Sequence, residues 1–543
     1  MRSFKISGNI VDVVNKRVFK GTVSVEGDTI ADITEDNLAK EDIYISPGLV
    51  DSHLHIESSM LIPSEFAAAA TVHGTTAVVA DPHEIANVLG VDGVKFMIEN
   101  GKKVPFRFYF GAPSCVPATP FESSGAEINA EEIKELLQSE DVFFLAEMMN
   151  FPGVIHDDEQ VHKKIELAKS LNKPIDGHAP ALSGEGLDKY VAAGISTDHE
   201  CFSKEEAAEK IKKGMKILIR EGSAAKNFED LIELVKDNPD DIMLCSDDLH
   251  PDDLIKGHIN LLVKRALAKG LDFFDVLRTV TLNPKKHYSL DNGLLAIGDK
   301  ADFVIVDNLN DFNVLSTYIA GQKVAENGKP LIEKVNEKHL NKFDCKDVSA
   351  DDIKVVAEAK KLNVIQALDG QLVTEKLKEN PKVVNGEVLS DTTKDILKII
   401  VLNRYKQAKP SVGFIKGFGL KNGAIASTIA HDSHNIIAVG TNDHDLVTAI
   451  NALVKCKGGI ASANEKEINV LPLPVGGLMT DESVTVVANK YQAIDNMAKK
   501  LGSKLKAPFM TLSFMALLVI PEIKISDKGL FDGKRFEFLP LFA

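Results

Sequence analysis

Between residues 48 and 287 the sequence alternates short apolar segments with longer segments of helical composition. The spacers at 129–138 and 205–213, for example, have the residue types and the period of amphipathic helices. The candidate strands lie at residues 48–53, 77–80, 106–110, 143–146, 174–176, 195–197, 216–219 and 242–245. About eight β/α units is the count of a (β/α)8 TIM-type barrel, and the length of the segment fits one barrel.

Two β-rich pieces flank this block. Residues 1–47 and 288–340 contain short runs of β-branched residues separated by turns such as Glu26-Gly27-Asp28. We expect both pieces to form one small β-sandwich, and residues 48–287 to form the barrel. A third region, residues 345–543, starts with a charged segment of helical appearance at 351–362 and continues as an α+β domain. The predicted class is therefore α/β with two additional domains.

Composition excludes several kinds of partner. The net charge of −16 argues against nonspecific nucleic-acid binding, and no run of Lys and Arg indicates a membrane surface. No segment reaches the ~18–20 apolar residues of a membrane span, and the N-terminus has no apolar run typical of a signal peptide. The five cysteines are scattered, without a C-x-x-C pair, and are interpreted as reduced thiols of a cytoplasmic protein.

Polar residues gather where the candidate strands end, which is where barrels of this type carry their functional groups. They are His53 and His55 after the first strand, Asp81, His83 and Glu84 after the second, Glu147 after the fourth, His178 after the fifth, His199 after the sixth and Asp247 after the eighth. In the pair His53-x-His55, residues i and i+2 point to the same face of a strand. Any one of these residues is more often structural, but such residues at six of the eight strand ends together indicate a site.

Four imidazoles and two carboxylates can hold two divalent ions, with Glu147 between them. Two such ions ~3.5–4 Å apart share and activate a water molecule. Asp247 can contact one ion and accept the proton of the attacking water. Alternatively, Asp247 and Asp248 could serve as a helix N-cap.

The residues Pro47-Gly48-Leu49-Val50-Asp51-Ser52-His53-Leu54-His55, followed by the isolated histidines and Ser246-Asp247, resemble the amidohydrolase superfamily. A closer resemblance is to the bacterial and archaeal adenine deaminase family. It is carried by the segments 56–60 (IESSM), 81–88 (DPHEIANV), 114–118 (SCVPA), 146–155 (AEMMNFPGVI), 220–225 (REGSAA), 417–420 (GFGL), 431–436 (HDSHNI) and 471–474 (LPLP).

This resemblance implies hydrolytic deamination of the free base adenine to hypoxanthine and ammonia, a step of purine salvage and adenine catabolism, with two Mn²⁺ or Fe²⁺ ions per subunit. The implied ligands are His53, His55, Glu147, His178, His199 and Asp247. Many superfamily members have a carboxylated lysine where this chain has Glu147. The resemblance also implies a homo-oligomer, with a homodimer expected.

Several roles stay open at this point. His83 is a candidate catalytic or metal contact, or a residue that only supports its neighbours by hydrogen bonding. His431 and His434 can close the active site, bind another metal or form a structural turn, and Arg220 can shape the pocket or belong to a structural turn. The rival functions are another nucleobase deaminase of the same superfamily and a metal-free scaffold with this fold.

Overall fold

The computed structural model describes residues 3–36, 42–358 and 360–543. Contacts divide the chain into two compact units. The first contains residues 1–82, 95–114 and 129–337, and the second contains residues 83–94, 115–128 and 338–543. The domain boundaries expected from the sequence stay a prediction. Among the described residues, no helix combines the length and apolar character needed to cross a bilayer.

Eight parallel strands form the barrel of the first unit. They are β5 (Leu49–Leu54), β6 (Thr75–Ala80), β7 (Arg107–Ala112), β8 (Val142–Met148), β9 (Ile175–Gly177), β10 (Thr197–Asp198), β11 (Lys216–Arg220) and β12 (Ile242–Cys245). β5 to β9 form one sheet in sequence order and β10 to β12 form another. The backbone N–H of Ser196 donates to Ile175 O at 3.0 Å, and the N–H of Asp247 donates to His53 O at 3.0 Å. These two contacts join the sheets into a closed barrel.

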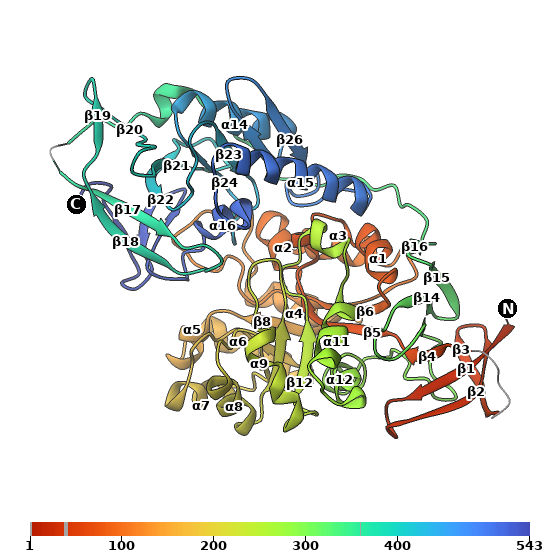
Figure 1. Cartoon of the computed structure of the whole chain (residues 1–543). Coiled ribbons are helices and arrows are strands. Elements are labelled where there is room, and N and C mark those ends of the chain that lie inside the picture. Colours follow the sequence, from red (N-terminus) through yellow and green to blue (C-terminus); the bar gives the residue numbers. More distant parts are fainter. Residues whose placement is uncertain (1–2, 37–41, 359) are drawn as a thin grey trace. The chain divides into compact units, whose positions relative to one another are not determined.

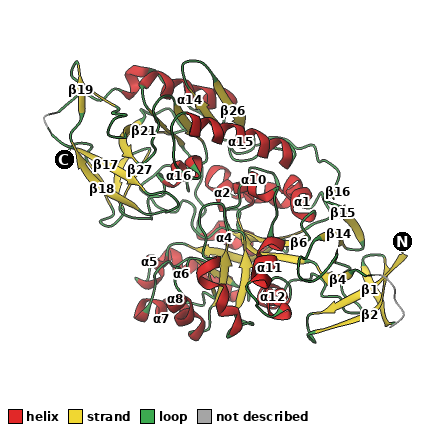
Figure 2. Cartoon of the chain, in the orientation of Figure 1, coloured by secondary structure: helices red, strands yellow, loops and turns green. Residues whose placement is uncertain are grey.

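The strands are buried along nearly their whole length, as expected for parallel strands covered on both faces. Helices lie outside them (Figures 1 and 2). In chain order these are η1 (Ile56–Ser59), α1 (Pro63–Thr71), α3 (Val91–Gly101), α4 (Ala130–Gln138), α5 (Phe151–Ile155), α6 (Glu159–Ser170), α7 (Gly184–Ala192), α8 (Lys204–Lys212), α9 (Phe228–Leu231), η2 (Ile232–Lys236), α10 (Pro251–Leu254), α11 (Ile259–Ala268), α12 (Phe273–Thr279) and α13 (Leu282–Tyr288). Helix α4 shows why these segments are helical. Asn129 and Glu132 form a capping box, and the apolar residues Ile133, Leu136 and Leu137 share one buried face.

The two flanks of the barrel pair with each other in one mixed sheet of eight strands, and their description as a small β-sandwich stays a prediction. Its strands are β1 (Ser3–Asp12), β2 (Arg17–Glu26), β3 (Thr29–Glu35), β4 (Tyr44–Pro47), β13 (Phe303–Val306), β14 (Val314–Ile319), β15 (Gln322–Glu326) and β16 (Lys329–Pro330). β4 joins the two pieces, because it pairs in parallel with β1 and antiparallel with β13. Since β4 runs directly into β5, this sheet fixes the chain where the barrel begins.

The second unit is built on another mixed sheet of eight strands, in the order β18-β17-β22-β21-β24-β23-β25-β26. Its elements are α2 (His83–Leu89), η3 (Ala350–Ile353), β17 (Leu362–Ala367), β18 (Thr374–Glu379), β19 (Lys382–Val384), β20 (Glu387–Leu389), β21 (Ile396–Leu402), β22 (Ser411–Lys416), β23 (Ala424–Ser427), β24 (Ile436–Gly440), α14 (Asp443–Cys456), β25 (Gly459–Ala463), β26 (Ile468–Pro472), α15 (Val484–Lys500), α16 (Pro508–Phe514), β27 (Ile523–Ser526), β28 (Gly529–Asp532) and β29 (Glu537–Leu539). Helix α14 packs its apolar residues, among them Leu446, Ile450 and Leu453, against β23 to β25.

The helix expected at 351–362 is wrong beyond its first turn. Among the described residues of this segment only those of η3 are helical, and Ser349 caps η3 through a capping box with Asp352. The chain then extends, because its backbone pairs with the hairpin of β19 and β20. The N–H of Val388 donates to Val355 O, and the N–H of Ala357 donates to Gly386 O, both at 2.9 Å. Tertiary pairing therefore overrides the helical propensity of this charged segment.

Candidate metal centre

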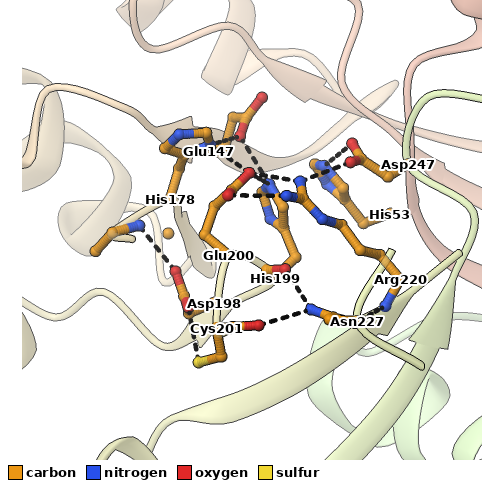
Figure 3. Close-up of polar contacts among 12 residues, drawn as sticks. His53, Glu147, His178, Asp198, His199, Glu200, Cys201, Arg220, Asn227 and Asp247 are labelled. Atoms are coloured by element: carbon orange, nitrogen blue, oxygen red, sulfur yellow. Dashed lines mark hydrogen bonds and ion pairs between the residues drawn. The ribbon is translucent and has the colours of Figure 1, made fainter. Parts of the chain in front are cut away.

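Six of the residues singled out from the sequence meet at the carboxyl ends of the barrel strands. His53 and Glu147 lie near the ends of β5 and β8, and the other four follow β5, β9, β10 and β12. Five have at most 4% of their surface exposed, and the side chain of His178 is 17% exposed. Figure 3 shows His53, Glu147, His178, His199 and Asp247 facing a common centre. The site is therefore an enclosed cluster of nitrogen and oxygen ligands.

One half of the centre combines the two histidines of β5 with Asp247. Asp247 Oδ1 lies 3.6 Å from His53 Nε2 and 3.3 Å from His55 Nε2. One ligand atom from each of these three residues lies within 4.8 Å of the others. His53 and His55 come together because they are two residues apart, and Asp247 is placed beside them by its backbone pairing with β5.

Glu147 organises the other half. Its Oε2 lies 2.8 Å from His178 Nδ1 and 3.2 Å from His199 Nε2. Its Oε1 lies 3.4 Å from His55 Nε2, on the side of the first three ligands. Because the two oxygens of one carboxylate face different histidines, Glu147 is the residue best placed to lie between two ions.

These spacings fit metal coordination. Two atoms bound to one ion at ~2.1 Å in tetrahedral geometry stand ~3.4 Å apart. His55 Nδ1 lies 3.1 Å from the carbonyl oxygen of Asp81, so the ring donates there and leaves Nε2 as a lone-pair ligand. His53 Nε2 is buried and has no hydrogen-bond partner among the residues that the structure describes. The donor set thus suits divalent ions that accept imidazole and carboxylate ligands.

Electrostatics keep both carboxylates charged. Burial opposes ionisation, but the charge of Arg220 and the nearby imidazoles of His53 and His55 hold the pKa of Asp247 well below its usual range. In the same way His178 and His199 overcome burial and lower the pKa of Glu147 well below its usual range. Burial lowers the pKa of His178, but Glu200 and Glu147 together raise it to about 9. A metal ion would therefore have to displace a proton from His178.

Two further charged residues belong to this centre: Glu200, which was not predicted as a site residue, and Arg220, for which the sequence left open a role in shaping the pocket or in a structural turn. Glu200 follows His199 directly, and Arg220 is the last residue of β11; both are buried. Their position at strand ends is the signal that pointed to the other residues. Asp248 is engaged elsewhere, since Ser58 Oγ donates to its carboxylate at 2.6 Å.

His83 begins α2 and belongs to the second unit. It is buried, with 4% of its surface exposed. Its part in catalysis or metal binding stays a prediction.

His431 and His434 form a buried cluster with Glu84 inside the second unit. The carboxylate oxygens of Glu84 lie 3.8 Å from His431 Nδ1 and 3.9 Å from His434 Nε2. The N–H of Ala430 donates to His434 Nδ1 at 3.3 Å, and burial lowers the pKa of His434 well below its usual value. A neutral ring that accepts at Nδ1 carries its proton on Nε2, so Nε2 is a donor and not a metal ligand. The tautomer of His434 therefore argues against a dedicated metal site, while the separations of 3.8 and 3.9 Å are too long for hydrogen bonds between Glu84 and the two rings.

Comparison with known proteins agrees with this architecture. Residues 44–324 match the amidohydrolase family, and residues 371–537 match the adenine deaminase C-terminal domain. The chain is 54% identical to an adenine deaminase of Methanosarcina mazei, over 99% of both chains. It is 52% identical to an adenine deaminase of Salinibacter ruber, over 100% of this chain and 99% of the relative. The similarity therefore spans both units.

The fold and the site define a metal-dependent hydrolase of the amidohydrolase family. More narrowly, the chain belongs to the adenine deaminase family, since relatives of that name are about half identical to it along its whole length.

Proposed function

We propose that this protein hydrolyses adenine to hypoxanthine and ammonia at the centre formed by His53, His55, Glu147, His178, His199 and Asp247. The observation that carries the proposal is the convergence of these six side chains, with ligand atoms 2.8–3.6 Å apart, in a chain of this family. The overall reaction replaces the 6-amino group of the purine with oxygen from water and releases ammonia.

Two divalent ions, Mn²⁺ or Fe²⁺, complete the proposed site. His53, His55 and Asp247 would hold one, His178 and His199 would hold the other, and Glu147 would contact both. When bound, such ions act as Lewis acids and make water a better nucleophile near neutral pH. The absence of thiolate among the six ligands fits Mn²⁺ and Fe²⁺, which accept imidazole and carboxylate donors.

Asp247 is the proposed proton carrier. Its carboxylate is ionised at neutral pH and lies beside both histidines of β5, so it can accept a proton from the attacking water. The same group then delivers that proton to the departing amine. Glu147 holds His178 and His199 in place, and the burial of the whole set excludes bulk water from the reacting atoms. His83 is proposed as a further catalytic contact.

The experiment is an ammonia-release assay on adenine, run side by side with Mn²⁺-loaded and Fe²⁺-loaded protein. The conversion is also followed through the ultraviolet change from adenine to hypoxanthine. Cytosine, guanine and adenosine form the comparison panel. A preference for one of these over adenine would replace the proposal with another nucleobase deaminase. Less than about one metal per chain together with no turnover would favour a metal-free scaffold.

We also propose that the protein acts in the cytoplasm as a homodimer. Light scattering coupled to size-exclusion chromatography measures the assembly directly. A mass close to that of one 59.1 kDa chain would contradict the dimer.

A further inference from the structure

A single buried guanidinium connects the two halves of the candidate centre. Arg220 Nη1 donates to Asp247 Oδ2 at 2.7 Å and also to Glu200 Oε1, while its Nη2 donates to Glu200 Oε2 at 2.9 Å (Figure 3). All three residues have at most 4% of their surface exposed. Charge-assisted bonds of this kind, shielded from water, are strong and fix the planes of the groups they join.

The contact assigns different tasks to the two oxygens of Asp247. Oδ2 accepts from Arg220, whereas Oδ1 faces His53 Nε2 and His55 Nε2. Without the guanidinium, the carboxylate could rotate about its last side-chain bond and exchange the two oxygens. Arg220 therefore selects the orientation in which Oδ1 points at the metal ligands.

Glu200 holds the guanidinium in this place. Its Oε1 lies 3.6 Å from both His178 Nδ1 and His199 Nε2, beyond hydrogen-bond distance, whereas both its oxygens accept from Arg220. Glu200 Oε1 is near enough to His178 and His199 to share an ion with them, but both Glu200 oxygens accept from the guanidinium, and we therefore assign Glu200 to positioning rather than to metal binding. Glu200 instead orients the guanidinium plane so that the second N–H of Arg220 Nη1 donates to Asp247.

The backbone of Arg220 is anchored to the same loop. Asn227 Oδ1 accepts from the Arg220 N–H at 2.8 Å, and Asn227 Nδ2 donates to His199 O at 3.0 Å and to Cys201 O at 3.1 Å. One amide side chain thus ties the end of β11 to the segment that carries His199 and Glu200. The position of Arg220 is determined from its backbone as well as from its side chain.

We infer that Arg220 is a positioning residue for Asp247, with Glu200 acting on Asp247 only through Arg220. This inference rests on the proposed deaminase function for its kinetic readout. A lysine in place of Arg220 would keep the buried positive charge, but its single nitrogen cannot serve both carboxylates in one plane. Geometry, rather than charge alone, is therefore the property to test.

The test uses the metal-loaded full-length protein with R220K, R220Q, E200Q and the double variant R220Q/E200Q. Arg265→Lys is the matched control, because Arg265 also forms ion pairs with two carboxylates, Glu221 and Glu229, but lies partly exposed on the outside of the same unit. We expect R220K to lower kcat by ~100-fold while KM changes by less than ~3-fold, since remote positioning of a proton carrier acts on the transition state. The control is expected to keep wild-type kcat and KM.

The double variant decides whether Glu200 acts through Arg220. We expect E200Q to lower kcat less than R220Q does, and R220Q/E200Q to match R220Q alone, because effects through a shared partner are not additive. If the kcat losses of R220Q and E200Q multiply in the double variant, or if R220K keeps the wild-type kcat, the inference is overturned. The loss of one metal ion per chain in E200Q would also overturn it, because Glu200 would then be a ligand.

Metal release gives a readout that does not need turnover. We expect a chelator to strip metal from R220K about tenfold faster than from the wild type and from Arg265→Lys, because Asp247 is no longer oriented as a ligand. If the wild type does not deaminate adenine, the proposed function fails, and the release rates still decide the positioning role. Equal release rates in R220K and the wild type would refute it.

Discussion

Asp51 accepts a hydrogen bond from the backbone N–H of Ser246 at 3.1 Å, and this contact links the first barrel strand to the end of the eighth. The other carboxylate oxygen of Asp51 accepts from Ser246 Oγ and lies 2.9 Å from His258 Nε2. Asp51 is two residues from His53, and Ser246 is next to Asp247. The link therefore sets the spacing between residues of the candidate centre, although neither partner is expected to contact a metal.

Replacing Asp51 with Ala is expected to destabilise the protein by about 2–4 kcal/mol. The change leaves the two buried donors of Ser246 without an acceptor and removes the carboxylate beside His258 Nε2, and unsatisfied buried groups are costly. Ser246→Ala removes only one of these bonds and should cost about 1 kcal/mol. Thermal unfolding of the metal-free proteins measures both effects. An unchanged midpoint in Asp51→Ala would contradict the role given to this contact.

The barrel could be predicted from sequence because its strands are buried on both faces and therefore form apolar runs. All eight predicted strands overlap β5 to β12. The convergence of His53, Glu147 and Asp247 could also be predicted, since the carboxyl ends of parallel strands meet at one end of a barrel. Their assignment as metal ligands stays a prediction.

The contacts of Arg220 could not be predicted in the same way. They depend on which of several nearby carboxylates the guanidinium reaches, and Glu200 and Asp247 lie 20 and 27 residues away along the chain. No periodicity encodes that choice. The extended segment after η3 is a similar case, because its pairing partner, the hairpin of β19 and β20, is distant from it in sequence and outweighs local propensity.

Asp247→Asn is expected to reduce turnover of adenine by at least ~1,000-fold. An amide still offers an oxygen toward His53 and His55, but it cannot accept a proton as a carboxylate does. Part of the bound metal should remain, which elemental analysis of the purified variant can show. Turnover within a few-fold of the parent would refute the proton-carrier role, and Asp248→Asn is the matched control because Asp248 binds Ser58 instead.

Removal of metal is expected to abolish activity, and reconstitution is expected to require two ions per chain. In the proposed site each ion has histidine ligands that the other lacks, so His178→Ala should leave about one tightly bound ion, whereas His162→Ala should leave two. His162 of helix α6 is a suitable control because its Nε2 donates to the carbonyl oxygen of Val154, and its side chain is partly exposed and lies outside the candidate centre. Elemental analysis after dialysis counts the ions. Full activity in thoroughly chelated protein would contradict the metal-dependent mechanism.

Lys524 of β27 provides a prediction about pH and stability within the second unit. Its ammonium is buried and donates to Phe514 O at 2.9 Å, and burial lowers its pKa from the ordinary 10.5 to about 7. Between pH 7 and 10.5 the unfolded chain keeps a proton on this lysine that the folded chain has released. The contribution of Lys524 to the free energy of unfolding therefore rises with pH across this window, by at most ~1.4 kcal/mol per pH unit. Below pH 7 the lysine is protonated in both states, and the full cost of burying its ammonium remains.

Lys524→Met removes this dependence. The unfolding temperature of the variant minus that of the wild type should be highest at pH 7. This difference should fall at pH 8 and fall further at pH 9, because the wild type becomes more stable as Lys524 loses its proton. Thermal unfolding of both proteins at each pH measures the effect. A constant difference between Lys524→Met and the wild type from pH 7 to 9 would show that Lys524 does not titrate in this window.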